Sequence, residues 1–88
     1  MMVTEFEKKV YLAVSGIPKG EVRSYKWVAK AAGRPRAARA VGNALNKNPY
    51  APVVPCHRVV KSDGSIGGFS KGIKSKKKLL ASEGVDVD

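Results

Sequence analysis

The residues best suited to chemistry lie side by side in the stretch PVVPCHRVVKSDG, residues 52–64. It holds the only cysteine and the only histidine of the chain, Cys56 and His57. A thiol beside an imidazole can be a nucleophile with its base, part of a metal site, or two neighbours in a buried strand. A tetrahedral zinc site needs about four ligands, which one cysteine and one histidine do not supply. We therefore predict no metal.

The surroundings of Cys56 favour the nucleophile. Arg58 and Lys61 follow it closely, and nearby cations favour the thiolate, which is the nucleophilic form. The alternative is a cysteine that is simply buried, as free cysteines often are. Adjacency alone does not pair Cys56 with His57, because neighbouring side chains of an extended segment point to opposite faces. A turn or a bridging water is needed.

The charge of the chain indicates a polyanionic partner. Seventeen Lys and Arg against seven Asp and Glu give a net charge of +10. No acid occurs between Glu21 and Asp63, a span that contains Arg23, Lys26, Lys30, Arg34, Arg36, Arg39, Lys47, Arg58 and Lys61. Such one-sided spacing predicts a phosphate-facing surface and a nucleic acid as the partner. The helical motif described below makes double-stranded DNA the expected nucleic acid. A membrane surface is the weaker alternative.

The length of 88 residues suits one domain, spanning residues 1–88, and we expect a monomer. A lone cysteine forms no internal disulfide, which favours a reducing compartment. The N-terminal stretch shows no signal-peptide core, and no run approaches the roughly 20 apolar residues that span a bilayer. We expect a cytoplasmic protein that is associated with the nucleoid through DNA, with no membrane partner.

The first half of the chain predicts three helices. Thr4 stands three residues before Glu7, as in a capping box, and opens a helix that closes near Gly16. Ser24 is the expected N-cap of a second helix, which Gly33 ends, and Pro35 suits the first turn of a third. Two short helices joined by a glycine-containing turn predict a helix-turn-helix. Phe6, Tyr11 and Trp27 are assigned to the core.

The third helix is rich in small residues, Ala37, Ala38, Ala40, Gly42 and Ala44, around a single Arg39. These small residues either pack against other helices or let the backbone approach a groove while Arg39 projects into it.

The second half predicts a strand, a Ser-Asp-Gly turn, a glycine-rich loop and a last helix. In that helix we expect Leu79 and Leu80 to point inward, the lysines outward, and Gly84 to be the C-cap, followed by a disordered acidic tail at 85–88. The fold class is thus a small, mainly α domain with a winged-helix-like helix-turn-helix and a short β-strand and loop element.

Three stretches are recognisable in this order and spacing: GEVRSYKWVAKAAGRPRAARAVGNALNKNP, PCHRVV and GGFSKGIKSKKKLLASEG. They resemble the DNA-binding, active-site domain of the O6-alkylguanine-DNA alkyltransferases, from about Phe6 to Gly84. PCHRV is highly specific for that family, and the arginine within AARAVG supports the resemblance independently.

The resemblance implies a repair protein that acts once and without a cofactor. The thiolate of Cys56 takes the alkyl group from the O6 atom of a flipped-out guanine and keeps it. By similarity, His57 is the base that acts on Cys56 through a water, and Glu83 orients its imidazole. From its position alone, Glu83 could also be a solvated carboxylate of the last helical turn.

The resemblance also assigns residues to the DNA and to the guanine. Arg39 is implied to be a finger that enters the base stack, Tyr25 to face the guanine ring and aid leaving-group protonation, and Asn48 to brace the active-site turn. From the residues alone, Tyr25 could also be only a core or helix-end aromatic, and Asn48 ordinary turn chemistry. The guanine would meet the Val59 carbonyl and the Ser70 amide. Further DNA-facing residues are Arg34, Arg36, Ala37, Ala38 and Gly42.

Three departures from the family pattern stand out. The N-terminal domain that family members commonly carry is not found, so a separate repair partner could supply its role. Phe69 replaces a common tyrosine, which removes a hydroxyl near the pocket. Lys71 replaces a commonly small residue at the pocket wall, so we expect it to restrict bulky adducts.

Two other functions compete. Alkyltransferase-like proteins bind O6-alkylguanine and flag it for excision repair without transfer, but they resemble this chain with the cysteine replaced, usually by tryptophan. A basic chromosome-coating protein would explain the net charge and leave the Pro-Cys-His loop unexplained.

Overall fold

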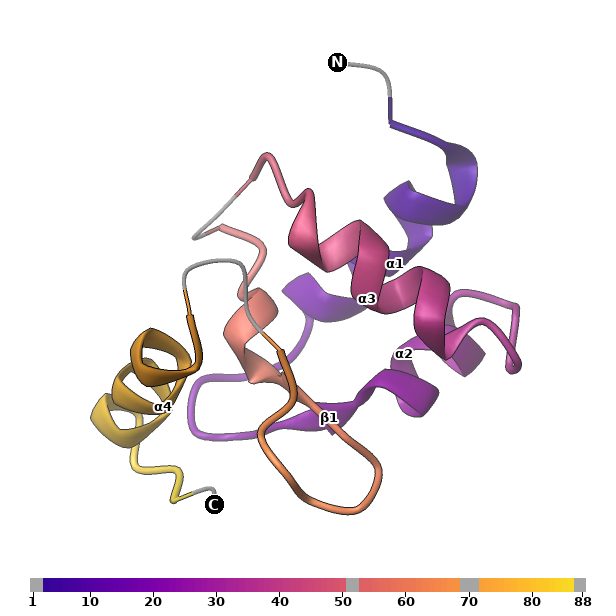
Figure 1. Ribbon diagram of the computed structural model, residues 1–88. Coiled ribbons are helices and arrows are strands. Elements are labelled where there is room, and N and C mark those ends of the chain that lie inside the picture. The colour runs from indigo at the N-terminus through magenta and orange to yellow at the C-terminus, as the bar shows by residue number, and fades with distance from the viewer. Residues whose placement is uncertain (1–2, 51–52, 69–71, 87–88) are drawn as a thin grey trace.

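The computed structural model describes residues 3–50, 53–68 and 72–86. The elements, in chain order, are α1 (Glu5–Ser15), β1 (Arg23–Ser24), α2 (Tyr25–Ala31), α3 (Ala38–Asn46), the 3-10 turn η1 (Cys56–Arg58), β2 (Val59–Val60) and α4 (Ile73–Ser82). Helices α1, α2 and α3 lie together, while α4 lies on the other side of the strands (Figure 1). The mainly α fold class is confirmed.

Local side-chain caps begin the first two helices, as predicted. The Thr4 hydroxyl accepts from the Glu7 amide at 3.1 Å, and the Glu7 carboxylate accepts from the Thr4 amide at 3.0 Å. The Ser24 hydroxyl accepts from the Trp27 amide at 2.9 Å and starts α2. Each cap satisfies an amide that the helix leaves without a partner. Gly33, with φ of 84°, turns the chain after α2.

The start of the third helix differs from the prediction. Helix α3 begins at Ala38, so Pro35 lies outside its first turn. Pro35 and Arg36 instead form a turn, which the Ala37 amide closes by donating to the Arg34 carbonyl at 3.0 Å. The fixed φ of proline suits a turn as well as a helix start, and here the turn redirects the chain between α2 and α3.

The main core lies between α1, α2 and α3 and includes the fully buried Val10, Val14, Val28 and Val41. Tyr11 is buried as predicted, and Phe6 is half-buried against this cluster. The assignment of Trp27 to the core was wrong, since 43% of this residue is exposed. Its successors Val28 and Ala29 form the buried face of α2, so Trp27 points outward, where the Arg23 guanidinium lies 5.5 Å from its ring centre.

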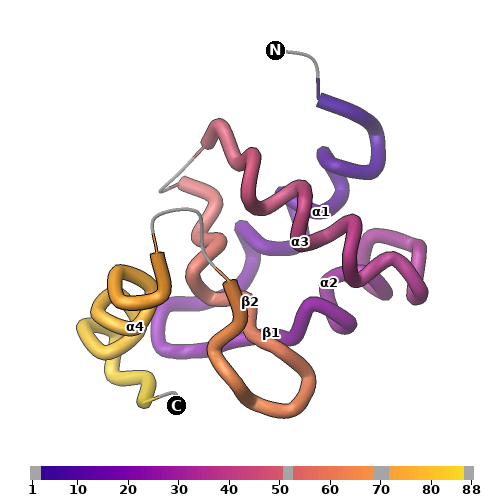
Figure 2. Tube along the Cα trace, viewed as in Figure 1, coloured from indigo at the N-terminus to yellow at the C-terminus, as the bar shows by residue number. Residues whose placement is uncertain are grey.

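The pairing of two short strands joins the helices of the first half of the chain to the segment that contains Cys56 and His57. β1 and β2 pair in parallel, with Arg23 opposite Val59 and Ser24 opposite Val60 (Figure 2). Because α2 begins immediately after β1, this register places Tyr25 beside Lys61. The predicted Ser-Asp-Gly turn follows β2, and the Lys61 amide closes it by donating to the Ser65 carbonyl at 2.9 Å.

Helix α4 faces inward through different residues than predicted. Leu80 is fully buried, but 41% of Leu79 is exposed, and Lys76 is fully buried. Residues four positions apart share a helix face, so the burial of Leu80 brings Lys76 inward and leaves Leu79 outside. Glu83 is the C-cap, and Gly84 follows with φ of 81°.

The end of the chain continues from this helix. Val85, at the start of the predicted disordered tail, packs partly against Val60, Ile66 and Leu80. Residues 87–88 lie outside the described residues. None of the helices in the described part of the chain is long and apolar enough to cross a membrane.

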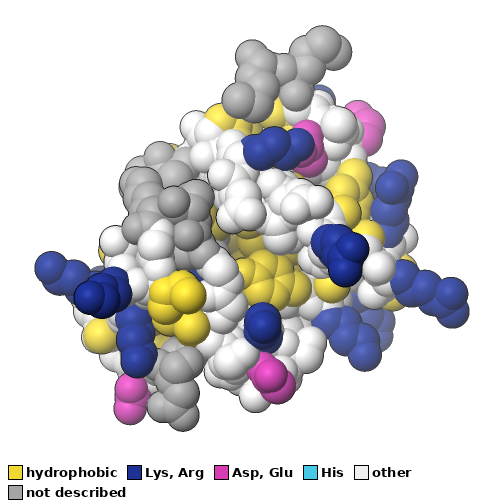
Figure 3. Space-filling view, in the orientation of Figure 1, with side chains coloured by type: hydrophobic (Ala, Val, Ile, Leu, Met, Phe, Trp, Pro, Cys, Tyr) yellow, Lys and Arg dark blue, Asp and Glu magenta, His cyan; other side chains and the backbone are white. Residues whose placement is uncertain are grey.

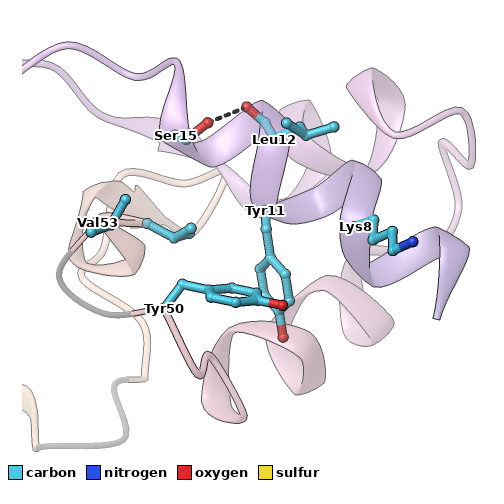
Figure 4. A pocket seen from close by; sticks show the side chains of 7 residues that line it. Lys8, Tyr11, Leu12, Ser15, Tyr50 and Val53 are labelled. Atoms are coloured by element: carbon cyan, nitrogen blue, oxygen red, sulfur yellow. Dashed lines mark hydrogen bonds between the residues drawn. The ribbon is translucent and has the colours of Figure 1, made fainter. Parts of the chain in front are cut away.

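An apolar hollow of about 590 Å³ lies between α1 and the segment that leads to η1 (Figure 4). Leu12, Tyr50 and Val53 line it and are largely exposed. At its floor, Tyr11 and Tyr50 meet edge to face, with ring centres 5.5 Å apart.

The Tyr11 hydroxyl is expected to stabilise the fold measurably. It donates to the Ala44 carbonyl at 2.7 Å in the buried core and thereby joins α1 to α3. Tyr11→Phe should lower the free energy of unfolding by about 1 kcal/mol, the net value of one hydrogen bond, plus the cost of leaving a buried carbonyl without this donor. Urea unfolding measures the change. Tyr50→Phe is the control, and an equal loss in both variants would contradict the argument.

Candidate active site

The Cys-His pair lies in the 3-10 turn η1, directly before β2. Cys56 and His57 are each only 8% exposed. The turn removes the alternation expected of an extended segment, because consecutive side chains of a 3-10 turn are about 120° apart and do not point to opposite faces. The Arg58 amide closes the turn by donating to the Pro55 carbonyl at 2.9 Å.

The carboxylate of Glu83, at the C-terminal end of α4, reaches this turn. Its Oε2 lies 3.1 Å from His57 Nε2. Arg58 donates to both of its oxygens, from Nε at 3.0 Å and from Nη2 at 2.7 Å. Arg58 Nη1 also donates to the Ile17 carbonyl at 2.9 Å, which ties the group to the segment after α1. One buried carboxylate therefore joins three parts of the chain.

This arrangement selects the tautomer of the neutral His57 ring. The hydrogen bonds from Arg58, followed by those from His57, lower the pKa of Glu83 from 4.5 to about 2. At neutral pH the carboxylate is therefore ionised and can only accept hydrogen bonds. In the neutral imidazole, Nε2 must then carry the proton that it donates to Glu83, which leaves Nδ1 with a free lone pair. In this tautomer, Nδ1 is the nitrogen through which His57 could accept a proton.

Asn48 supports the segment that leads into the turn. Its Nδ2 donates to the Val54 carbonyl at 2.9 Å, and its Oδ1 accepts from the Tyr50 amide at 2.9 Å. These two bonds span the proline-rich stretch from both ends. The role of Asn48 in bracing the turn, which the family resemblance implies, stays a prediction.

A second hollow, of about 290 Å³, lies between α3 and the loop after β2. Four predicted site residues line it: Tyr25, Ala38, Arg39 and Gly42. Lys61, from the predicted phosphate-facing span, also lines it, and sequence reasoning missed the other lining residues, which are Asn43, Asn46 and Gly68. Asn43 and Asn46 follow Arg39 by four and seven positions, so helical periodicity could have identified them.

Tyr25 is held tightly at the wall of this hollow. Its hydroxyl donates to the Gly68 carbonyl at 3.3 Å. Burial raises the pKa of this phenol, and the charge of an ionised Cys56 raises it further, so Tyr25 keeps its proton at neutral pH. Gly67 has φ of 73°, and a Cβ on it would lie 3.0 Å from the Tyr25 ring. Only glycine fits there without moving the ring.

Lys76 lies behind Tyr25 and was not predicted as a site residue. Its Nζ donates to the Val59 carbonyl at 2.6 Å and to the Gly68 carbonyl at 3.0 Å, and lies 3.5 Å from the Tyr25 hydroxyl. In the sequence it is one of four lysines at 74–78, where composition suggests a solvated face. The signal in the sequence was its position four residues before Leu80, which places the two side chains on the same face of the helix.

The remaining predicted residues are distributed as follows. Arg36 and Arg39 are exposed, and the Arg34 guanidinium lies 5.2 Å from the centre of the Phe6 ring, away from the hollow. Ala37 is the N-cap of α3, and the Val59 carbonyl accepts from Lys76. Figure 3 shows Lys and Arg side chains around an apolar area on the face where α3 lies. Phe69, Ser70 and Lys71 lie outside the described residues.

In the same described ranges, no three side chains of His, Cys, Asp or Glu come together as a metal site requires.

Removal of the Glu83 charge should change the dependence of stability on pH. Because its pKa falls from 4.5 to about 2 on folding, ionised Glu83 stabilises the fold fully above pH 4.5, and this contribution is lost as the pH falls toward 2. Glu83→Gln should lower the free energy of unfolding at pH 7 by about 1–3 kcal/mol. The difference between the two proteins should shrink between pH 4.5 and 2 in urea unfolding.

Glu21→Gln is the matched control for this experiment. Glu21 pairs with Arg23 at 2.8 Å, but its side chain is 51% exposed, so its loss should change stability little. A Glu83→Gln deficit that stays constant from pH 7 to pH 2 would show that the charge of Glu83 is not what stabilises the fold.

Comparison with known proteins gives a consistent result. Residues 5–85 match the family model described as 6-O-methylguanine DNA methyltransferase, DNA binding domain. Methylated-DNA–protein-cysteine methyltransferases from Methanosarcina barkeri and Methanothermobacter thermautotrophicus are 50% and 46% identical to the chain, over 91% and 97% of it. The chain spans about half the length of these relatives, 51% and 47% respectively.

Solved structures agree. The chain is similar to Mycobacterium tuberculosis OGT in complex with DNA, with a TM-score of 0.89, 46% identity and coverage of 93% of this chain and 51% of that one. It is also similar to S. pombe Atl1 in complex with damaged DNA containing O6-carboxymethylguanine, with a TM-score of 0.83, 42% identity and coverage of 98% and 82%. The family model matches nearly the whole chain, and so the chain belongs to the family of the 6-O-methylguanine DNA methyltransferase DNA-binding domain.

Proposed function

We propose that this chain repairs DNA directly by moving the alkyl group of O6-alkylguanine onto Cys56, once per molecule. The observation that carries the proposal is the geometry of the buried turn. Cys56 stands beside an imidazole whose outer nitrogen is bound to the ionised Glu83 and whose other nitrogen keeps its lone pair. The relatives named as methyltransferases at 46–50% identity support it.

The proposed reaction begins with proton removal. His57 Nδ1 takes the proton of Cys56 through a water, and Glu83 stabilises the imidazolium that forms. The thiolate then attacks the alkyl carbon, the bond from carbon to O6 breaks, and its electron pair leaves with the guanine. Tyr25 gives its hydroxyl proton to the departing base. The product is an S-alkylcysteine, which has no leaving group that would restore the thiol, so turnover is single.

Recognition of the guanine is proposed to use main-chain groups. The Val59 carbonyl accepts from Lys76 and has a second lone pair for the exocyclic amine of guanine. The Ser70 amide would meet O6. Asn48 keeps the turn in place through its two bonds across residues 50–54.

The DNA is proposed to bind along α3. A base inside a duplex must be extruded before a thiol can reach its substituent. Arg39 lies on α3 at the same hollow as Tyr25, with the small residues Ala38 and Gly42 beside it, so that the helix can approach a groove while Arg39 enters the stack. Arg34, Arg36 and Ala37 lie just before these residues and would meet the backbone.

A second candidate function is lesion binding without transfer. One observation favours it: the chain is also similar to S. pombe Atl1, which was solved with damaged DNA containing O6-carboxymethylguanine. A binder of this kind needs the hollow and Arg39 but neither Cys56 nor the His57–Glu83 pair. The two candidates therefore differ in one measurable step.

Covalent transfer can be read directly from protein mass. After mixing with duplex DNA that contains O6-methylguanine, the intact mass should rise by one methyl group in place of one hydrogen, and peptide mapping should locate the methyl group on Cys56. Cys56→Ser is the control and should keep its mass. Unmodified protein that nevertheless binds the lesion tightly would favour the binder instead.

Substitutions of Arg39 and Arg36 can distinguish a side chain that enters the base stack from one that contacts a phosphate. A side chain that fills the space of an extruded base acts only when the base is out. Arg39→Ala should therefore slow transfer from duplex DNA about tenfold or more, change affinity for intact duplex less, and leave transfer from the free O6-alkylguanine base nearly unchanged.

Arg36→Ala is the matched control, since Arg36 is equally exposed but lies in the turn before α3. It should weaken lesion and intact duplex alike and reduce the slope of log affinity against log salt by about one unit. Indistinguishable behaviour of the two variants in rate and affinity assays would make Arg39 a phosphate contact.

A further inference from the structure

Among the described residues, Lys76 is the only lysine that is fully buried. Burial of a cation is costly unless other groups compensate it. Burial lowers the pKa of Lys76 to about 8, while the charge of an ionised Cys56 opposes that change, so Lys76 remains mostly protonated at neutral pH. In a domain of this size, such a residue costs stability unless the contacts of its ammonium group compensate for the burial.

The three contacts of Lys76 converge on the wall of the hollow beside α3. The ammonium donates to the carbonyls of Val59 and Gly68, and it lies 3.5 Å from the Tyr25 oxygen and 5.6 Å from the centre of its ring. Tyr25 and Gly68 line the hollow, whereas Lys76 does not. Lys76 can therefore affect the hollow only through the residues that line it.

The Gly68 carbonyl is shared in a way that bears on proton donation. It accepts from the Tyr25 hydroxyl at 3.3 Å and from Lys76 at 3.0 Å. Lys76 also donates to this carbonyl, so the carbonyl keeps a donor from the protein when the Tyr25 hydroxyl turns to a substrate.

The charge of Lys76 acts in the same direction. A lysine has donors and no acceptor, so it can approach Tyr25 only at the lone pairs of its oxygen, which keeps the O–H directed elsewhere. When Tyr25 gives up its proton, negative charge develops on an oxygen that faces an ammonium in a buried setting, where the attraction is strong.

We propose that Lys76 is a positioning residue that frees the Tyr25 hydroxyl to protonate the departing guanine. This inference rests on the proposed alkyl transfer. In the step concerned, the carbon–O6 bond breaks as the sulfur–carbon bond forms, the guanine anion takes the Tyr25 proton, and the Tyr25 phenolate beside Lys76 regains a proton from solvent. Lys76 itself touches neither the guanine nor the alkyl group.

A double-mutant cycle tests the inference through single-turnover rates of transfer from duplex DNA containing O6-methylguanine. Lys76→Met keeps the length of the side chain and removes its charge and donors. It should slow transfer about tenfold, the effect of one hydrogen bond to a reacting group. In the Tyr25→Phe background, the same substitution should change the rate less than twofold, because the hydroxyl on which Lys76 acts is gone.

Two comparisons distinguish a positioning role of Lys76 from a merely structural one. Lys77→Met changes an exposed lysine one position along α4 and should leave both rates unchanged. If Lys76→Met slows transfer by the same factor with and without the Tyr25 hydroxyl, Lys76 is only a structural residue and the inference is wrong. If the unsubstituted chain transfers nothing, the proposed function itself fails, which is a different result.

A second measurement needs no Lys76 variant, should Lys76→Met fail to fold. At each pH, the transfer rate of the unsubstituted chain is divided by that of Tyr25→Phe. Effects of pH on Cys56 and His57 are common to both proteins and cancel in this ratio. Tyr25 and Cys56 are the titratable groups that act on Lys76, and Tyr25 itself keeps its proton through this range. The ratio should fall at least threefold from pH 7 to 9.5, as charge-assisted bonds become neutral. A constant ratio would overturn the inference.

Discussion

The carboxylate of Glu83 is the group on which the rest of the site depends. It receives two hydrogen bonds from Arg58 and one from His57, while Arg58 also reaches the Ile17 carbonyl. Arg58 supplies a fixed, planar donor pair, so the carboxylate cannot turn away from the imidazole. The same ion pair that holds α4 against the turn therefore also selects the tautomer of His57. Under the proposed function, one interaction therefore both supports the fold and orients the base.

Features set by neighbouring residues could be predicted from the sequence. The Thr4 and Ser24 caps, the Gly33 turn and the turn after β2 depend on side chains within a few positions of one another, and all of them are present in the structure. The stretch around Pro35 was harder, because proline fits both a helix start and a turn. Only the packing of α3 against α2 decides between the two.

Burial within a helix could not be predicted so well, because it depends on what faces the helix. Trp27 and Leu79 are apolar yet exposed, whereas Lys76 is charged yet buried. For Lys76 the deciding partners, the Val59 and Gly68 carbonyls, come from β2 and from the loop after it, 17 and 8 residues before Lys76 in the chain. Residue types do not show where main-chain carbonyls will lie, so the lysine-rich composition of the segment led to the prediction that this side chain is exposed to solvent.

The two-residue pairing of β1 with β2 connects the two halves of the site. Cys56 and His57 lie in the turn before β2, and Tyr25 lies directly after β1. The parallel register of Arg23 with Val59 thus sets how far Tyr25 is from the Cys-His turn along the strands. A slip by one residue would turn the side chains of β1 to the opposite face and move Tyr25 away from Gly68 and Lys76. So short a ladder cannot hold this register alone. The Lys76 bonds to the Val59 and Gly68 carbonyls, together with the contact of Gly67 with the Tyr25 ring, add the constraint from outside the sheet.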